Sequence, residues 1–118
     1  MEEQLKLRTK NIGLKVIKLF DELPNNPSAY QISRQITRSS TSVGANYRSA
    51  CRAKSGPDFI NKLRIVEEEA DETLYWLEIL EESNLIDPGK IVELKKEVNE
   101  IIAIMVSSIN TMRNKTIR

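Results

Sequence analysis

The sequence contains no histidine, a single cysteine, and few aromatic, glycine or proline residues among its 118 positions. Histidine is the commonest proton-transfer residue near neutral pH and the commonest metal ligand, so its absence argues against two frequent kinds of catalytic centre. A lone cysteine, Cys51, excludes an internal disulfide framework and suits a reducing compartment. The remaining composition is dominated by helix-forming residues.

The chain also lacks a long apolar run. The longest uncharged stretch, residues 101–112, is well short of the roughly 20 residues that a membrane-spanning helix needs. No secretory signal is visible, because Glu2, Glu3 and Lys6 interrupt the N-terminal region. We therefore expect a cytoplasmic protein with no membrane contact.

Apolar residues recur at helical spacing in four segments, separated by three short breaks. The segments are residues 5–23, 27–50, 59–80 and 91–112, and each break carries helix-starting residues: Asn26 before Pro27, Ser55 three residues before Asp58, and Asp87 before Pro88. Short connections between long helices favour antiparallel neighbours. The sequence predicts one all-α domain over residues 1–118, an up-down-up-down antiparallel four-helix bundle.

The last two segments carry more apolar residues than one core can cover. A helix that is apolar on most faces is buried on most faces, and large exposed patches mark interfaces. The sequence therefore predicts a homo-oligomer, against the alternative of a monomer with Tyr75 and Trp76 along its surface. The predicted interface consists of Leu74, Tyr75, Trp76, Ile79, Ile102 and Val106.

Charge is strongly sorted along the chain. Residues 1–54 hold ten basic and four acidic residues, a net charge of +6, whereas residues 55–118 hold eight and thirteen, a net charge of −5. No acidic residue occurs from Leu23 to Pro57. Such sorting indicates contact, either between helices or with an outside partner such as nucleic acid.

Four arginines concentrate this positive charge. On a helix, Arg34, Arg38, Arg48 and Arg52 fall within a sector of about 80°, along a stripe about 27 Å long. Each guanidinium can bind a phosphate with two hydrogen bonds, so RNA or DNA backbone is one predicted partner. Lys54 adds charge, and Tyr47 either stacks on a base or packs in the core.

The alternative is that the stripe is neutralised by the acidic third segment. In an antiparallel hairpin, Arg38 would face Asp71 and Glu78, and the other arginines would face neighbouring acids: Glu78 and Glu81 for Arg34, Glu67 and Glu68 for Arg48. The protein would then be an interaction scaffold. Both hypotheses stay open at this stage.

Neither a catalytic nor a metal centre is indicated. The acids of residues 67–72 lack the histidines of helical-bundle metal sites. The hydroxyl run of residues 39–42 has no adjacent base, so we interpret it, together with Gly44, as a site of close helix packing. We predict no catalytic residue, metal or cofactor.

A distinctive stretch, Arg-Ser-Ser-Thr-Ser-Val-Gly-Ala-Asn-Tyr-Arg-Ser-Ala over residues 38–50, occurs with Glu-Glu-Ala-Asp-Glu-Thr-Leu-Tyr-Trp-Leu over residues 68–77 and a closing Arg113. In these motifs the chain resembles the bacterial four-helix bundle family first found encoded in intervening sequences of large-subunit rRNA genes. The resemblance implies a ring-shaped homopentamer, in a family whose members mostly have no assigned activity and no catalytic residues.

A related branch of that family comprises the accessory variability proteins of diversity-generating retroelements. Those proteins bind nucleic acid and a reverse transcriptase through a positively charged pentameric barrel, which extends the expected partners to a reverse transcriptase. Many relatives carry acids around the positions of Ser49, Arg52 and Lys54, where this chain is neutral or basic. The departure favours a non-enzymatic, nucleic-acid-binding accessory protein here.

Overall fold

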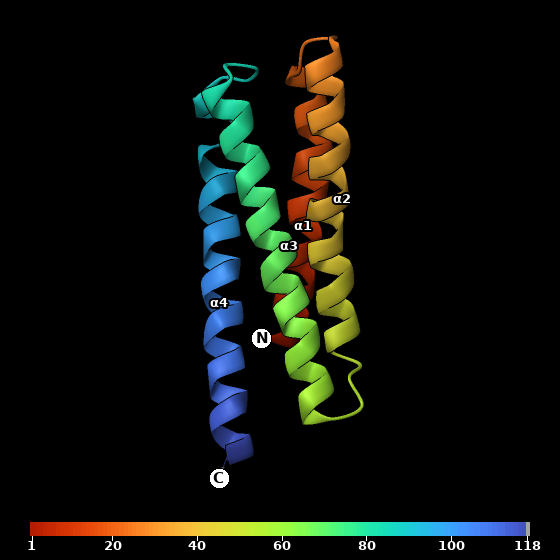
Figure 1. Cartoon of the computed structure of the whole chain (residues 1–118), viewed down its shortest axis with the longest axis vertical. Coiled ribbons are helices and arrows are strands. Elements are labelled where there is room, and N and C mark those ends of the chain that lie inside the picture. Colours follow the sequence, from red (N-terminus) through yellow and green to blue (C-terminus); the bar gives the residue numbers. More distant parts are fainter. Residues whose placement is uncertain (118) are drawn as a thin grey trace.

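Four α-helices follow one another along the chain in the computed structural model, which describes residues 1–117 and the side chains of residues 1–115. They are α1 (Glu2–Leu19), α2 (Pro27–Ala50), α3 (Gly56–Glu82) and α4 (Val92–Ile117), with 3₁₀ turns η1 (Phe20–Glu22) and η2 (Pro88–Lys90). Figure 1 shows them running alternately up and down in a body of 52 × 21 × 19 Å. The described residues contain no strand, and the all-α prediction is confirmed.

The predicted starting residues cap two of these helices. The Asn26 side chain accepts a hydrogen bond of 2.9 Å from the Ala29 backbone N–H, at the start of α2. Ser55 accepts one of 3.2 Å from Asp58 N–H at the start of α3. Asp87 instead begins the short turn η2, so the last helix starts later than its Asp-Pro pair predicts.

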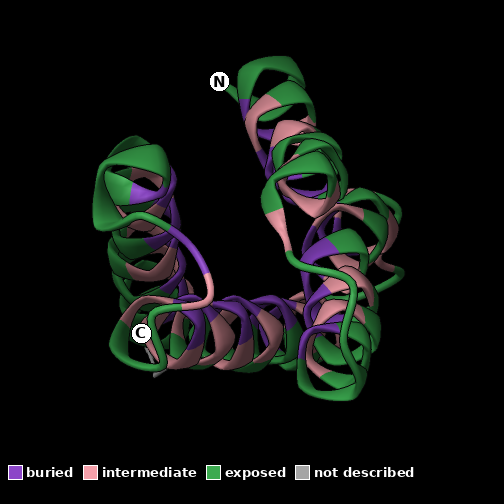
Figure 2. Cartoon of the chain, turned by 90° about the horizontal axis from the view of Figure 1, so that it is seen from above, coloured by how far each residue is buried: buried purple, intermediate pink, exposed green. Residues whose placement is uncertain are grey.

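The apolar stripes of all four helices meet in a single core. In Figure 2 the buried residues line the inner sides of the helices, while exposed residues lie outside. The largest fully buried side chains come from every helix: Ile12, Val16, Ile36, Val43, Leu63, Val66, Leu77, Leu80, Ile91, Val98, Ile101 and Met105. Helical periodicity thus predicted the core correctly.

Two glycines set the spacing between α1 and α2. A Cβ atom on Gly44 would lie 3.0 Å from the Cα atom of Lys10, and one on Gly13 would lie 3.3 Å from the Cα atom of Thr41. Both are backbone contacts, which a side-chain movement cannot relieve. The close packing predicted at Gly44 is therefore present, and it brings α2 against α1.

Charged groups connect α1 to α4. The Arg8 guanidinium donates to both carboxylate oxygens of Glu97, at 2.7 and 2.9 Å, and to Glu100 at 3.1 Å. Arg8 lowers the pKa of Glu97 below its usual range, because the hydrogen bonds favour the ionised carboxylate. The pair joins the first and last helices of the chain.

Candidate nucleic-acid interface

The four predicted arginines and Lys54 all have exposed side chains. Arg34, Arg38 and Arg48 occupy this position because α2 turns its apolar stripe inward, with Ile36 and Val43 fully buried on the opposite side of the helix. Arg52 and Lys54 lie in the connection after Ala50. Small residues such as Ala45 leave the α2 backbone accessible between the arginines of the helix. Three of the four arginines predicted from helical spacing thus lie on one exposed side of α2, and Arg52 lies beyond the end of the helix.

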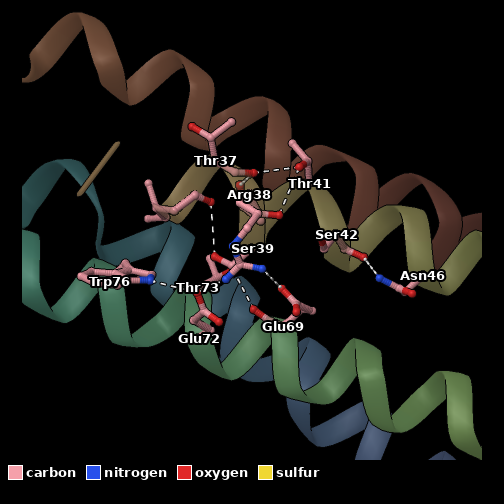
Figure 3. A network of polar contacts seen from close by, with 12 residues as sticks. Thr37, Arg38, Ser39, Thr41, Ser42, Asn46, Glu69, Glu72, Thr73 and Trp76 are labelled. Carbon is pink, nitrogen blue, oxygen red and sulfur yellow. Dashed lines mark hydrogen bonds and ion pairs between the residues drawn. The ribbon is translucent and has the colours of Figure 1, made fainter. Parts of the chain in front are cut away.

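Arg38 differs from the others because carboxylates of α3 neutralise it. Its guanidinium pairs with Glu72 and, at 3.2 Å, with Glu69, as Figure 3 shows. Trp76 Nε1 also donates to Glu72 at 3.2 Å. The Arg38 hydrogen bond is the main reason that the pKa of Glu72 is lowered. Half of the Arg38 side chain remains exposed.

The predicted partners of Arg38 are wrong. Arg38 forms no ion pair with Asp71 or Glu78 among the described residues, because Glu69 and Glu72 occupy the side of α3 that faces α2. The rotation of α3 about its own axis decides this, and it is fixed by the core rather than by charge. Counting residues along an antiparallel hairpin gives only the height of a residue on α3, so it could not identify Glu69 and Glu72 as the partners.

The remaining bases have no such partner. Within the described part of the chain, Arg34, Arg48, Arg52 and Lys54 form no ion pair. The predicted pairing of Arg34 with Glu78 or Glu81, and of Arg48 with Glu67 or Glu68, is therefore wrong. Internal neutralisation holds for one arginine of the stripe.

An exposed aromatic ring that the sequence analysis did not select stands beside the stripe. Tyr30 is 59% exposed, and the Arg34 guanidinium carbon lies 5.9 Å from its ring centroid, a cation–π contact. The signal was available, since Tyr30 and Arg34 are four residues apart on one helix. Tyr47 is only 6% exposed and belongs to the core, so it is not available for stacking.

The six residues of the predicted oligomer interface do not form one patch. Leu74, Trp76 and Ile102 pack partly buried against the core, whereas Tyr75 and Val106 are exposed. Trp76 shares a stripe of α3 with Glu69 and Glu72, toward α2.

Val106 lies on the α3-facing side of α4, because it follows Lys95 by eleven residues and Lys95 pairs with Glu81 at 3.4 Å. Ile79 has an intermediate exposure on α3. The predicted set is thus divided between the α2–α3 and α3–α4 sides of the molecule.

Metal and membrane sites are not evident in the part that the structure describes. No group of three or more potential metal ligands comes together among these residues. None of the described helices combines the length and the hydropathy needed to cross a bilayer.

This arrangement of helices defines a small antiparallel four-helix bundle. Residues 4–107 match the family model described as "23S rRNA-intervening sequence protein", and the chain belongs to that family. A crystal structure of a protein of unknown function from the S23 ribosomal protein family of Bacteroides thetaiotaomicron is similar, with a TM-score of 0.84 and 36% identity. The similarity covers 92% of this chain and 97% of that one. No curated protein matches the sequence.

Proposed function

We propose that the protein is a non-enzymatic, homo-oligomeric accessory protein that binds the phosphate backbone of RNA or DNA through the exposed face of α2. The observation that carries this proposal is that Arg34 and Arg48 on α2, and Arg52 in the turn after it, are exposed with no ion-pair partner among the described residues. Unneutralised guanidinium groups bind phosphate oxygens with strong, charge-assisted hydrogen bonds.

The surroundings of the stripe support a polyanionic partner. The whole of α2 and both of its flanking connections, from Leu23 to Pro57, contain no acid that would repel phosphate. Contacts of this kind position a nucleic acid without reading its bases. Binding is therefore expected to depend weakly on sequence.

Tyr30 favours a partner with unpaired bases. An exposed aromatic ring beside a guanidinium can stack on a base while the cation contacts the adjoining phosphate. We therefore expect single-stranded regions to bind more tightly than a duplex of equal length.

The oligomer rests on different evidence. Exposed apolar side chains remain on α1, α3 and α4 outside the core, among them Leu7, Tyr75 and Val106. The family resemblance suggests a pentameric ring, which would multiply the number of arginine stripes. It also suggests a reverse transcriptase as a binding partner of the complex. The alternative of a scaffold with a neutralised stripe is supported at Arg38 alone.

The test compares the salt dependence of binding in two variants of equal net charge. Arg34→Gln/Arg48→Gln/Arg52→Gln removes the stripe, and Arg64→Gln/Lys90→Gln/Arg113→Gln removes three exposed bases elsewhere. The probe is a fluorescently labelled RNA stem-loop with a single-stranded tail. Each lost phosphate contact lowers the slope of log affinity against log salt by about 0.7–0.9, so the stripe variant should lose a slope of about two.

The control variant should retain the slope of the unmodified protein. The proposal is overturned if the unmodified protein does not bind the probe, or if both variants lose affinity and slope equally. In the second case general positive charge would explain the binding, and α2 would have no special part in it.

A further inference from the structure

An open groove runs along the outer side of α1 and α2. It encloses about 770 Å³ above the close approach of the two helices at Gly13 and Gly44. Its α1 wall carries Leu7, Leu14 and Ile17, which are 59%, 47% and 46% exposed. Three large aliphatic side chains on one surface helix are not explained by the core, so this groove is a candidate interface.

The edges of the groove are basic. Lys10 and Arg48 line it with exposed side chains and form no ion pair within the described residues. Glu3 also lines the groove, but Lys6 pairs with it at 3.2 Å, so the net charge of the lining is positive. The apolar floor offers no hydrogen-bond donors, so it is unsuited to the phosphate backbone of a nucleic acid. A complementary partner would present apolar side chains flanked by carboxylates.

The opposite side of the same molecule carries apolar side chains flanked by carboxylates. Asp71, Tyr75, Glu78 and Glu82 succeed one another on α3 at steps of four and three residues, so they form one stripe. The exposed Tyr75 therefore lies among carboxylates. Figure 1 places α3 and α4 together on one side of the molecule and α2 on the other.

Val106 extends this stripe onto α4, on the side of that helix that also carries Lys95, whose ion pair with Glu81 joins the two helices. We call Asp71, Tyr75, Glu78, Glu82 and Val106 the α3–α4 face. It offers exposed apolar groups that match the apolar floor of the groove, and acidic neighbours that match its basic edges.

We propose that the α1–α2 groove of one copy of this protein receives the α3–α4 face of a second copy. This inference rests on the homo-oligomer of the proposed function and defines how its subunits meet. The contact is heterologous, because each copy contributes a different surface. Repeated head-to-tail contacts of this kind close into a ring when the rotation between neighbours allows it.

The contact has a consequence for the arginine stripe. Arg48 stands at the rim of the groove, where carboxylates of the next copy would compete with phosphate for its guanidinium. Arg34 does not line the groove, so it stays free for phosphate. The oligomer would therefore divide the basic residues of α2 between self-association and nucleic-acid binding.

A mixing experiment tests this pairing in the absence of nucleic acid, with molar mass in solution as the measurement. Leu14→Glu disables the groove and Val106→Glu disables the α3–α4 face. Ile65→Glu is the matched control, since Ile65 is an exposed aliphatic residue on the α2 side of α3. Circular dichroism verifies that each variant is folded.

The unmodified protein and Ile65→Glu should be oligomers, and Leu14→Glu and Val106→Glu should each be monomers. An equimolar mixture of the two monomers should form a dimer, because it contains one intact groove and one intact face. Retention of the oligomer by either variant, or a mixture that stays monomeric, overturns the inference and leaves the proposed homo-oligomer standing. A monomeric unmodified protein overturns both.

If a glutamate variant fails to fold, charge reversal provides a second pair on the exposed surface. Lys10→Glu and Glu82→Lys should each lower the fraction of oligomer several-fold, and mixing the two should restore it because the reversed charges again attract. No restoration on mixing overturns the inference. Neither measurement involves nucleic acid, so a failure of the proposed nucleic-acid binding would be recognised separately from a failure of this subunit contact.

Discussion

The hydroxyl groups of Ser39 in α2 and Thr73 in α3 share a hydrogen bond of 2.9 Å inside the core. Both residues are fully buried. Each hydroxyl also lies within hydrogen-bonding distance of a carbonyl in its own helix, Ile36 O at 3.3 Å and Glu69 O at 2.9 Å. The pair thus joins two helices without leaving a buried polar atom unsatisfied, and it fixes the level at which α2 meets α3.

We expect Ser39→Ala and Thr73→Val each to lower the free energy of unfolding by about 1 kcal/mol, the usual contribution of one hydrogen bond. The double variant should lose clearly less than the sum, because the second substitution removes a partner that is already unpaired. Urea unfolding of the four proteins measures this coupling. Strictly additive losses would show that the bond contributes nothing across the two helices.

Gly44→Ala should destabilise the protein, although alanine favours a helix. The new methyl group would lie 3.0–3.1 Å from the backbone Cα and N atoms of Lys10, so α1 must move away. Overpacking costs about 1–3 kcal/mol, and helix propensity returns at most about 1 kcal/mol.

Gly56→Ala is the matched control for that substitution, because nothing lies within 4 Å of its would-be Cβ atom. Thermal unfolding should show a lower midpoint for Gly44→Ala and little change for Gly56→Ala. Equal midpoints for the two variants would contradict the close approach of α1 and α2 as the reason for a glycine at position 44.

The fold was predictable because apolar spacing alone determines which side of each helix is buried. Ile36 and Val43 on α2, or Val98 and Met105 on α4, follow one stripe in the sequence and are fully buried in the structure. Capping by Asn26 was predictable for a similar reason, since its side chain bonds a backbone group three residues away. Local rules suffice for both features.

The site was less predictable because pairing between helices depends on how each helix is rotated. Helical spacing places Arg34 and Arg38 in the same sector, yet only Arg38 meets carboxylates. Glu72 is held in place by Trp76 as well as by Arg38, a relationship that requires the position of α3. Long, flexible side chains on a surface are therefore the part of the molecule that the sequence determines least.

Releasing Arg38 from its carboxylates should strengthen nucleic-acid binding. In Glu69→Gln/Glu72→Gln the guanidinium is free to contact one more phosphate, so the slope of log affinity against log salt should steepen by about 0.7–0.9. Glu67→Gln/Glu68→Gln changes the net charge equally on the same helix, at carboxylates that do not pair with Arg38, and should leave the slope unchanged. The same steepening in both variants would assign the effect to net charge.

Acid should weaken the protein partly through Glu97, because the hydrogen bonds from Arg8 hold the folded-state pKa of this carboxylate below its usual range. A carboxylate with a lowered pKa contributes stability above its unfolded pKa, and this contribution is lost as the pH falls through the folded pKa. Both side chains are about one-quarter exposed, so solvent screening limits the contribution to about 1 kcal/mol.

Arg8→Gln should therefore lower the free energy of unfolding at pH 7 and flatten its decline below pH 5, relative to the unmodified protein. Arg64→Gln removes an exposed arginine that forms no ion pair within the described residues, and it should leave both quantities unchanged. Urea unfolding at a series of pH values measures the two curves. If Arg8→Gln keeps the full acid-induced loss, the α1–α4 ion pair does not stabilise the folded protein, because a group with the same pKa in both states contributes no pH dependence.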